Sequence, residues 1–434
     1  MQRERFLLCL CVIALTWAIV SCSSFNQQTE DNSAASSIRG CQLASSSTIS
    51  PQLASLAEAY TLFCYGELFG LRGEMDKALA ELEKAGTRLP QSGYINFEQA
   101  RILIEQDRII DAIEMLDSTI SKSPDMAEAY VLRGDAHRML LDIPKAVRDY
   151  RRGAELGFDE ATLRFTIAEL LNIAREYDEA IVELKRLKEI EPDSLRADFS
   201  LGRLYLNIKE PAKAVPYLEA VVAAHPGDLH STMQLFEAYQ QSSEFEDAIV
   251  LARKLVARMP QDAQFRYLLA TFMEQAGKLD EAIEQLETLV KMDPDFAAGL
   301  NCLGYIYIDK GLNLKRGISL VRAALAIEPH NSAFLDSLGW GLFRLGDLGA
   351  AIKQLEKAVA GLKDLNSEPI ICGHLAIAYK MAGRTKDAEE YTAILKSASK
   401  DDSAIQELLN ELSSISVSQK DEEATVSLKD AVLR

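Results

Sequence analysis

Apolar residues recur at helical spacing through most of the chain. Leu62, Gly66 and Phe69 make one stripe, and Leu79 and Leu82 begin the next. Residues three to four apart share one face of an α-helix, so each stripe predicts an amphipathic helix with one side to bury. A single pair of such helices cannot bury both stripes alone. The pattern therefore predicts helix pairs that stack on one another.

The helix pairs repeat every 34 residues. Prolines mark the period, each 34 residues from the last except for one gap of 68: Pro90, Pro124, Pro192, Pro226, Pro260 and Pro294. An alanine stands twelve residues before each mark, and before Phe158 in the gap: Ala78, Ala112, Ala146, Ala180, Ala214, Ala248 and Ala282. Small residues stand twelve positions earlier again, among them Gly66, Ala100, Gly134, Ala168, Gly202, Ala270, Gly304, Gly339 and Ala376. We expect the two helices of a pair to approach most closely there.

One unit reads Leu201-Gly202, Tyr205, Ala214 and Pro226. This order resembles the tetratricopeptide repeat, which has Leu-Gly, a Tyr three residues after the Gly, then Ala and Pro. The register gives ten repeats in an array over residues 51–402, about four-fifths of the chain. The resemblance implies an all-α fold, a right-handed α-solenoid (superhelix) of about ten helix-turn-helix repeats. Its concave inner face would bind protein or peptide ligands.

Glycine marks the turn between the two helices in half of the repeats. These glycines are Gly73, Gly277, Gly311, Gly346 and Gly383. Glycine ends helices readily because it adopts left-handed backbone conformations without steric cost. The sequence therefore predicts the turn of each repeat at this place in the register.

The N-terminus has the pattern of an export signal. Arg3 and Arg5 precede fifteen mostly apolar residues over 6–20, which is short for a membrane span. The end of this segment, Ile19-Val20-Ser21-Cys22, resembles a bacterial lipobox and implies a signal peptide over 1–21 and a lipid on Cys22. Ser23 after the cysteine implies sorting to the outer membrane, with the protein facing the periplasm. An ordinary secretory signal and an uncleaved anchor that uses Trp17 remain alternatives.

The segments that flank the array are polar. Residues 22–50 carry the lipid cysteine and hold nine serines between 23 and 50, which predicts a flexible tether. Residues 403–414 place Ile405, Leu408, Leu409 and Leu412 on one stripe, so we expect a helix that caps the exposed end of the last repeat. A polar tail over 415–434 follows.

Charge and motifs argue against several function classes. The chain has 47 Lys and Arg against 65 Asp and Glu, a net charge of −18, so nucleic acid is not expected as a partner. No phosphate loop, dinucleotide fingerprint, HExxH or GxSxG motif is present. His225 and His230 lie five apart, off the spacing that aligns metal ligands on one helix. We therefore expect no catalysis, cofactor, metal or small-molecule substrate.

In tetratricopeptide repeats, ligands lie along the first helix of each repeat. The corresponding positions here carry rings with interleaved arginines, a combination typical of interface hot spots. The predicted partner-binding residues are Tyr60, Phe63, Tyr94, Phe97, Arg101, Arg138, Phe165, Arg196, Phe199, Arg203 and Tyr267, with Tyr305, Trp340 and Phe343 as a second patch. The alternative is that each ring only packs between neighbouring first helices. A clamp for the carboxylate tail of chaperones is not expected, because Phe63, Glu67, Phe97 and Arg101 replace its Lys and Asn residues.

These observations predict a lipid-anchored scaffold in a bacterial cell envelope that binds protein partners through a concave groove. Its plan resembles lipoproteins that hold a periplasmic protease or cell-wall hydrolase near its substrates. A pilotin-like assembly factor for a pilus, secretion or export machine is the alternative, and an enzyme with an unrecognised site is a third. If the rings bind a partner, Phe97→Ala with Phe199→Ala weakens its capture with little change in melting temperature.

Overall fold

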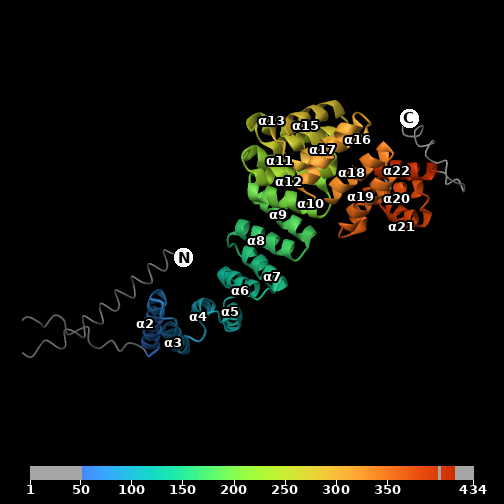
Figure 1. Cartoon of the computed structure of the whole chain (residues 1–434). Coiled ribbons are helices and arrows are strands. Elements are labelled where there is room, and N and C mark those ends of the chain that lie inside the picture. Colours follow the sequence, from blue (N-terminus) through green and yellow to red (C-terminus); the bar gives the residue numbers. More distant parts are fainter. Residues whose placement is uncertain (1–50, 399–401, 416–434) are drawn as a thin grey trace, which may run out of the picture. The chain divides into compact units, whose positions relative to one another are not determined.

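The computed structural model describes residues 51–398 and 402–415, and this part of the chain is helical without a strand (Figure 1). It contains 21 α-helices and one short 3-10 helix, which confirms the predicted all-α solenoid of helix pairs. The predicted signal peptide, Cys22, the tether and the tail from residue 416 lie outside the described residues. The chain divides into two compact units, and the boundary between Leu235 and Phe236 falls inside one helix.

Unit 1 consists of five helix pairs, and the second helix of each pair packs against the first helix of the next. Its helices are α2 (Pro51–Leu71), α3 (Met75–Arg88), α4 (Gly93–Glu105), α5 (Ile109–Lys122), α6 (Ala127–Met139), α7 (Ile143–Glu155), α8 (Glu160–Ile173), α9 (Tyr177–Ile190), α10 (Leu195–Asn207) and α11 (Pro211–Ala224). The helix that holds the unit boundary is α12 (Leu229–Ser242).

Unit 2 continues the same scheme of packed helix pairs. Its helices are α13 (Phe245–Arg258), α14 (Ala263–Gln275), α15 (Leu279–Met292), α16 (Ala297–Asp309), α17 (Leu314–Ile327), α18 (Ser332–Leu345), α19 (Leu348–Ala360), the 3-10 helix η1 (Leu365–Ser367), α20 (Pro369–Met381), α21 (Thr385–Ser397) and α22 (Ser403–Ser414). None of the helices in the described residues is long and apolar enough to cross a membrane.

The small residues of the register hold the helix pairs together at close range. A Cβ atom added to Gly202 of α10 would lie 2.5 Å from Leu218 of α11, and one added to Gly339 of α18 would lie 2.6 Å from Leu355 of α19. Real Cβ contacts are longer, so only a small residue fits between the two backbones. The alanines of the second helices are fully buried, as Ala214 shows at 0% exposure. The predicted points of closest approach are therefore confirmed.

The turn inside each pair places one residue in the left-handed region. The five predicted glycines all do so, with φ between 64° and 89°. In the other repeats the same place holds a residue with a side chain, also at positive φ: Asp107, Leu141, Arg175, Lys209 and Ser243. The backbone conformation is thus common to all the turns, and glycine is the residue that adopts it with the least steric strain.

Leu141→Gly is expected to stabilise unit 1 by about 0.5–1 kcal/mol, because it relieves the left-handed strain at φ 59°. Leu141 is 83% exposed, so its removal loses little burial. Gly277→Ala, at φ 75°, is the control of opposite sign and should destabilise unit 2 by about 1 kcal/mol. Guanidinium unfolding followed by circular dichroism measures both. A destabilised Leu141→Gly variant would contradict the strain assignment.

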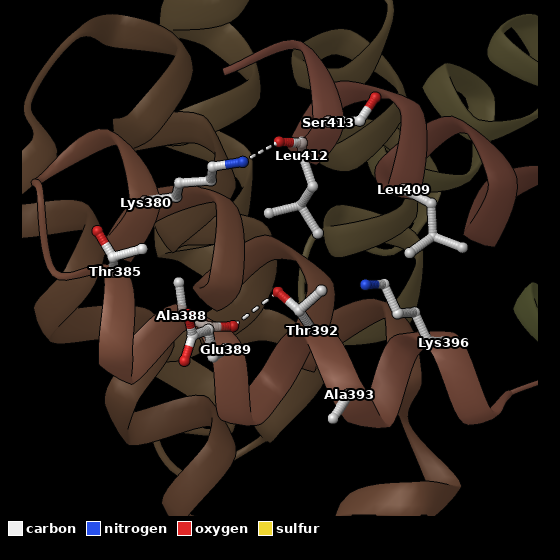
Figure 2. A pocket seen from close by; sticks show the side chains of 10 residues that line it. All are labelled: Lys380, Thr385, Ala388, Glu389, Thr392, Ala393, Lys396, Leu409, Leu412 and Ser413. Carbon is white, nitrogen blue, oxygen red and sulfur yellow. Dashed lines mark hydrogen bonds between the residues drawn. The ribbon is translucent and has the colours of Figure 1, made fainter. Parts of the chain in front are cut away.

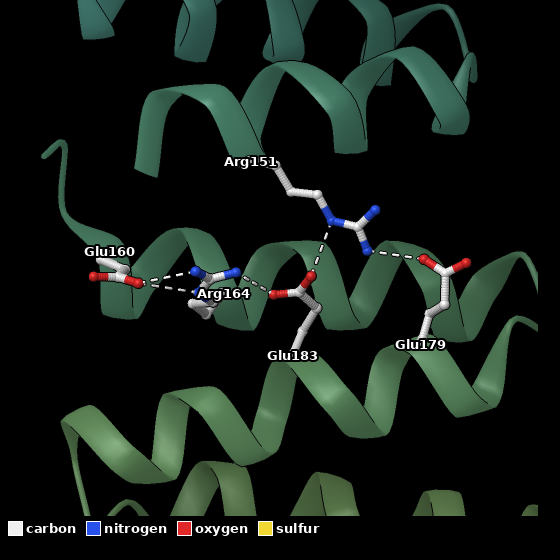
Figure 3. A network of polar contacts seen from close by, with 5 residues as sticks. All are labelled: Arg151, Glu160, Arg164, Glu179 and Glu183. Atoms are coloured by element: carbon white, nitrogen blue, oxygen red, sulfur yellow. Dashed lines mark hydrogen bonds and ion pairs between the residues drawn. The ribbon is translucent and has the colours of Figure 1, made fainter. Parts of the chain in front are cut away.

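The buried carboxylates Asp149, Glu183 and Asp198 of unit 1 are each paired with a cation from a neighbouring helix. Glu183 of α9 is 1% exposed and accepts hydrogen bonds from Arg151 of α7 at 2.9 Å and from Arg164 of α8 at 2.6 Å (Figure 3). Arg151 also donates to Glu179, and Arg164 to Glu160. A carboxylate can be buried at this depth only because its charge is paired. The network joins three consecutive helices and has a structural role.

Candidate functional site

The predicted rings of the first two repeats form one continuous aromatic cluster. Phe63 of α2 and Tyr94 of α4 have ring centroids 5.7 Å apart, and Tyr94 stacks on Phe97 at 6.2 Å. Tyr94 is 36% exposed and Tyr60 is 37% exposed, so their rings can meet a partner. Phe97, at 9% exposure, belongs to a core cluster with Leu103. Its replacement by alanine therefore lowers stability, and the expectation of an unchanged melting temperature is not supported.

A second group of predicted residues forms a ladder of arginines on rings, here called the arginine–ring cluster. The Arg196 guanidinium of α10 lies 5.0 Å from the ring of Phe165 on α8, and the Arg203 guanidinium lies 5.7 Å from Phe199. The His230 ring at the start of α12 adds to it, 5.4 Å from Phe199. Both phenylalanines are half-buried and both arginines are exposed. Aromatic faces attract cations in this way and leave the guanidinium edges free to bind.

Arg203 differs from Arg196 in its charge partners. Arg196 reaches Glu191 at 3.4 Å, whereas no carboxylate within residues 51–398 and 402–415 lies at ion-pair distance from Arg203. His230 is not among the partner-binding residues that the sequence predicts. It holds the same place in α12 as Arg196 does in α10, and this register was the signal that could have identified it.

The other two predicted arginines are engaged with nearby carboxylates. Arg101 contacts three carboxylates, Glu98 at 2.7 Å, Glu67 at 3.6 Å and Glu105 at 4.0 Å. Arg138 contacts Asp135 at 3.3 Å and the hydroxyl of Tyr150 at the same distance. Their charges are therefore balanced locally, and they contribute less to a binding surface than Arg203 does.

In unit 2 the predicted rings are more deeply placed. Tyr267 of α14 is half-buried and lies 5.5 Å from the ring of Phe296, and burial raises the pKa of its hydroxyl. Burial also raises the pKa of Tyr305 on α16. The thiol of Cys302 nearby has its pKa raised to about 12, again by burial. It stays protonated at neutral pH and lacks the thiolate that a nucleophile needs.

Two of the three residues of the second predicted patch do not lie on the surface. Trp340 is 3% exposed and Phe343 is 5% exposed, so both belong to the core of unit 2. Trp340 stacks on Phe343 with centroids 5.0 Å apart and on His374 of α20 at 4.2 Å. The His374 Nδ1 lies 2.9 Å from Asp336 Oδ1, and this pair is buried. Spacing along the chain carried no signal of the pair, because its members lie 38 residues apart.

A small open groove of about 330 Å³ lies between α21 and α22. Figure 2 shows Lys380, Lys396 and Glu389 at its walls, with Leu409 and Leu412 on the side of α22. The groove contains none of the predicted residues. In the described part of the chain, no three His, Cys, Asp or Glu side chains gather as metal ligands would.

The repeats match known sequences. Residues 97–160, 174–228 and 239–301 match the tetratricopeptide repeat family. A tetratricopeptide repeat-containing protein of Pseudomonas aeruginosa is 33% identical over 79 residues, which are 18% of this chain and 13% of that protein. The chain thus spans only about an eighth of that relative's length.

Two solved structures of repeat proteins match about half of the chain. The C-terminal part of a tetratricopeptide repeat-containing protein from Cytophaga hutchinsonii is 16% identical, with 56% of this chain and 99% of that chain covered and a TM-score of 0.43. A tetratricopeptide repeat protein from Parabacteroides merdae is 15% identical, with coverages of 58% and 99% and a TM-score of 0.34. Tetratricopeptide repeats generally bind protein partners. The repeat register, the helix pairs and the matched segments together show that this chain contains tetratricopeptide repeats.

Proposed function

We propose that this protein is a non-catalytic scaffold that binds a partner protein through the groove-lining first helices of unit 1. A lipid on Cys22 would hold it in a bacterial cell envelope, at the outer membrane and facing the periplasm. In this setting the scaffold raises the local concentration of an envelope protease or cell-wall hydrolase near its substrates.

The observation that carries the proposal is the arginine–ring cluster. Exposed guanidinium groups stacked on half-buried rings combine a fixed geometry with large contact area, which is the composition of interface hot spots. Arg203 has no carboxylate partner in the described residues, although the chain as a whole is strongly acidic. A free cation on an acidic protein favours a partner segment that brings its own carboxylates.

The test is capture of the partner by crosslinking and pull-down from cells that produce the protein. We expect the double variant Arg196→Glu with Arg203→Glu to recover the partner at least tenfold less than the native chain. The matched control is Arg148→Glu with Arg186→Glu, exposed arginines on the second helices α7 and α9. It makes the same change in net charge away from the cluster and should leave recovery unchanged. Equal recovery with both double variants would exclude the cluster as the binding site.

The identity of the captured protein separates the alternatives. A protease or cell-wall hydrolase supports the recruiting scaffold, and a component of a pilus, secretion or export machine supports the pilotin-like role. An enzyme with an unrecognised site predicts instead that the purified chain turns over a substrate without a partner. Lipid attachment has its own test: Cys22→Ala should leave the protein unprocessed or free of the membrane. Unchanged processing and membrane retention would refute the lipid anchor.

A further inference from the structure

The last helix, α22, occupies the groove side of the final repeat. Gly373 of α20 stands three residues before Ala376, as Phe63 stands three before Gly66, so Gly373 holds the groove position that Phe63 holds in α2. The side chain of Leu408 on α22 packs directly on it, because a Cβ at Gly373 would lie only 2.8 Å from Leu408 Cδ1. The sequence predicted a cap on the end of the array. The helix packs on α20 and α21 of that last repeat, and its contact with Gly373 lies where a ligand of the first helices would lie.

The contacts of α22 are those of a docked amphipathic helix. Ile405, Leu408 and Leu412 are buried, and they join the core cluster that contains Trp340 and Tyr379. The Lys380 ammonium of α20 donates to the Leu412 carbonyl at 2.5 Å, which satisfies a free carbonyl at the end of α22 and complements its dipole (Figure 2). Apolar residues at i, i+3 and i+7 in a groove are a recurring mode of helix recognition.

Charged groups of earlier repeats influence the acidic residues of α22. The pKa of Glu411 is raised, chiefly by burial and also by Asp309 at the end of α16, while Arg344 of α18 and His374 of α20 act in the opposite direction. The charge of Glu407 in turn contributes, after burial and nearer acids, to the raised pKa of Tyr305 on α16. The buried apolar side chains of α22 belong to one core cluster with Ile308 of α16, Trp340 of α18 and Leu375 of α20.

The packing of neighbouring helices around α22 is incomplete on one side. The open groove of about 330 Å³ separates part of α22 from α21, so Leu409 is only partly covered. Three buried apolar side chains must hold a twelve-residue helix that is too short to be stable alone. Segments with few buried contacts open before the rest of a structure does.

We propose that the surface formed by α16, α18 and α20 is a binding site for an amphipathic, acidic helix of a partner protein, and that α22 is the resident occupant which this partner displaces. The partner helix carries apolar residues at i, i+3 and i+7 and acidic residues beside them, as α22 does. The site lies in unit 2 and shares no residue with the arginine–ring cluster, so either proposal can fail without the other.

The probe is a fluorescent peptide of residues 402–415, titrated against the full chain by fluorescence anisotropy. The native chain should bind it weakly, since α22 competes at the high effective concentration of an attached ligand. The variant Leu408→Glu with Leu412→Glu empties the site and should bind at least tenfold more tightly. The control Asn410→Glu changes an exposed residue of the same helix and should behave as the native chain. Adding Lys380→Glu to the double variant should abolish the gain.

Three outcomes decide against the proposal. Absence of peptide binding by the double variant, with its helicity intact, would show that the surface does not accept a helix in trans. A native dimer that persists in Asn410→Glu and is lost in the double variant would make a second copy of the chain the occupant. Hydrogen exchange on the native chain decides even if the double variant fails to fold. We expect α22 amides to exchange at least tenfold faster than those of α20, and equal protection would show that α22 is a fixed part of the core.

Discussion

Trp340→Ala is expected to lower the free energy of unfolding of unit 2 by about 3–5 kcal/mol, the usual cost of removing a buried aromatic side chain. Trp340 is 3% exposed between Phe343 and His374, so its loss leaves a cavity that rigid helices cannot fill. Guanidinium unfolding by circular dichroism measures the loss, and hydrogen exchange should locate it in α18 and α20. Trp340→Phe, which keeps a ring in the stack, is the control and should cost less than about 2 kcal/mol.

The stability of the Trp340→Ala variant also tests whether Trp340 belongs to the core or to a binding surface. A residue that contacts only a partner changes binding and leaves stability nearly unchanged, because surface substitutions shift stability by less than about 0.5 kcal/mol. Tyr60→Ala supplies that comparison, since Tyr60 is 37% exposed on α2. If Trp340→Ala proved as mild as Tyr60→Ala, the stack with His374 would be wrong and the surface patch would be restored.

Glu183→Ala is expected to destabilise unit 1 by about 3 kcal/mol, because it leaves Arg151 and Arg164 facing an apolar gap without their shared carboxylate (Figure 3). Water reaches Arg151, which keeps the cost at the lower end for a broken buried pair. Glu179→Ala is the matched control. It removes an exposed partner of the same Arg151 and should cost less than about 1 kcal/mol.

Glu183→Ala and Glu179→Ala are measured by denaturant unfolding, with hydrogen exchange of α7, α8 and α9 to localise the effect. A loss confined to these helices is expected, since each repeat contacts only its neighbours. If Glu183→Ala and Glu179→Ala lowered the free energy of unfolding equally, the buried ion pairs of Glu183 would contribute no more to stability than the exposed pair of Glu179. Glu183→Gln should fall between them, because an amide keeps the size of the side chain without its charge.

The fold could be predicted because it follows from short-range rules repeated many times. Gly202 opposite Leu218 illustrates the rule, since one close approach fixes one helix pair and the register copies it along the chain. The candidate site was less predictable. Phe97 and Phe199 hold the same place in their helices, yet Phe97 is buried and Phe199 is half-buried. The difference comes from neighbouring side chains in adjacent repeats, which the position within one repeat does not encode.

Trp340 shows what a repeat register omits altogether. Its position, one residue after Gly339, corresponds to Arg203 after Gly202, and Arg203 is exposed. Trp340 is covered because α20 brings His374 over its ring and α22 closes the same core cluster. The helix α22 lies beyond the last repeat, so no comparison between repeats could place it. The sequence identified α22 as a helix with one apolar stripe, and only the structure shows which surface that stripe covers.

The shared backbone of the turns has a consequence for how such chains change in length. The turn residues from Gly73 to Gly311 recur at constant spacing, and Leu141, Lys209 and Gly277 all adopt the left-handed conformation there. Unequal recombination between two gene segments that encode such turns would join two turns with the same backbone conformation. The product would gain or lose whole repeats with every helix intact, so duplication and deletion are mutations that this architecture absorbs without a new junction.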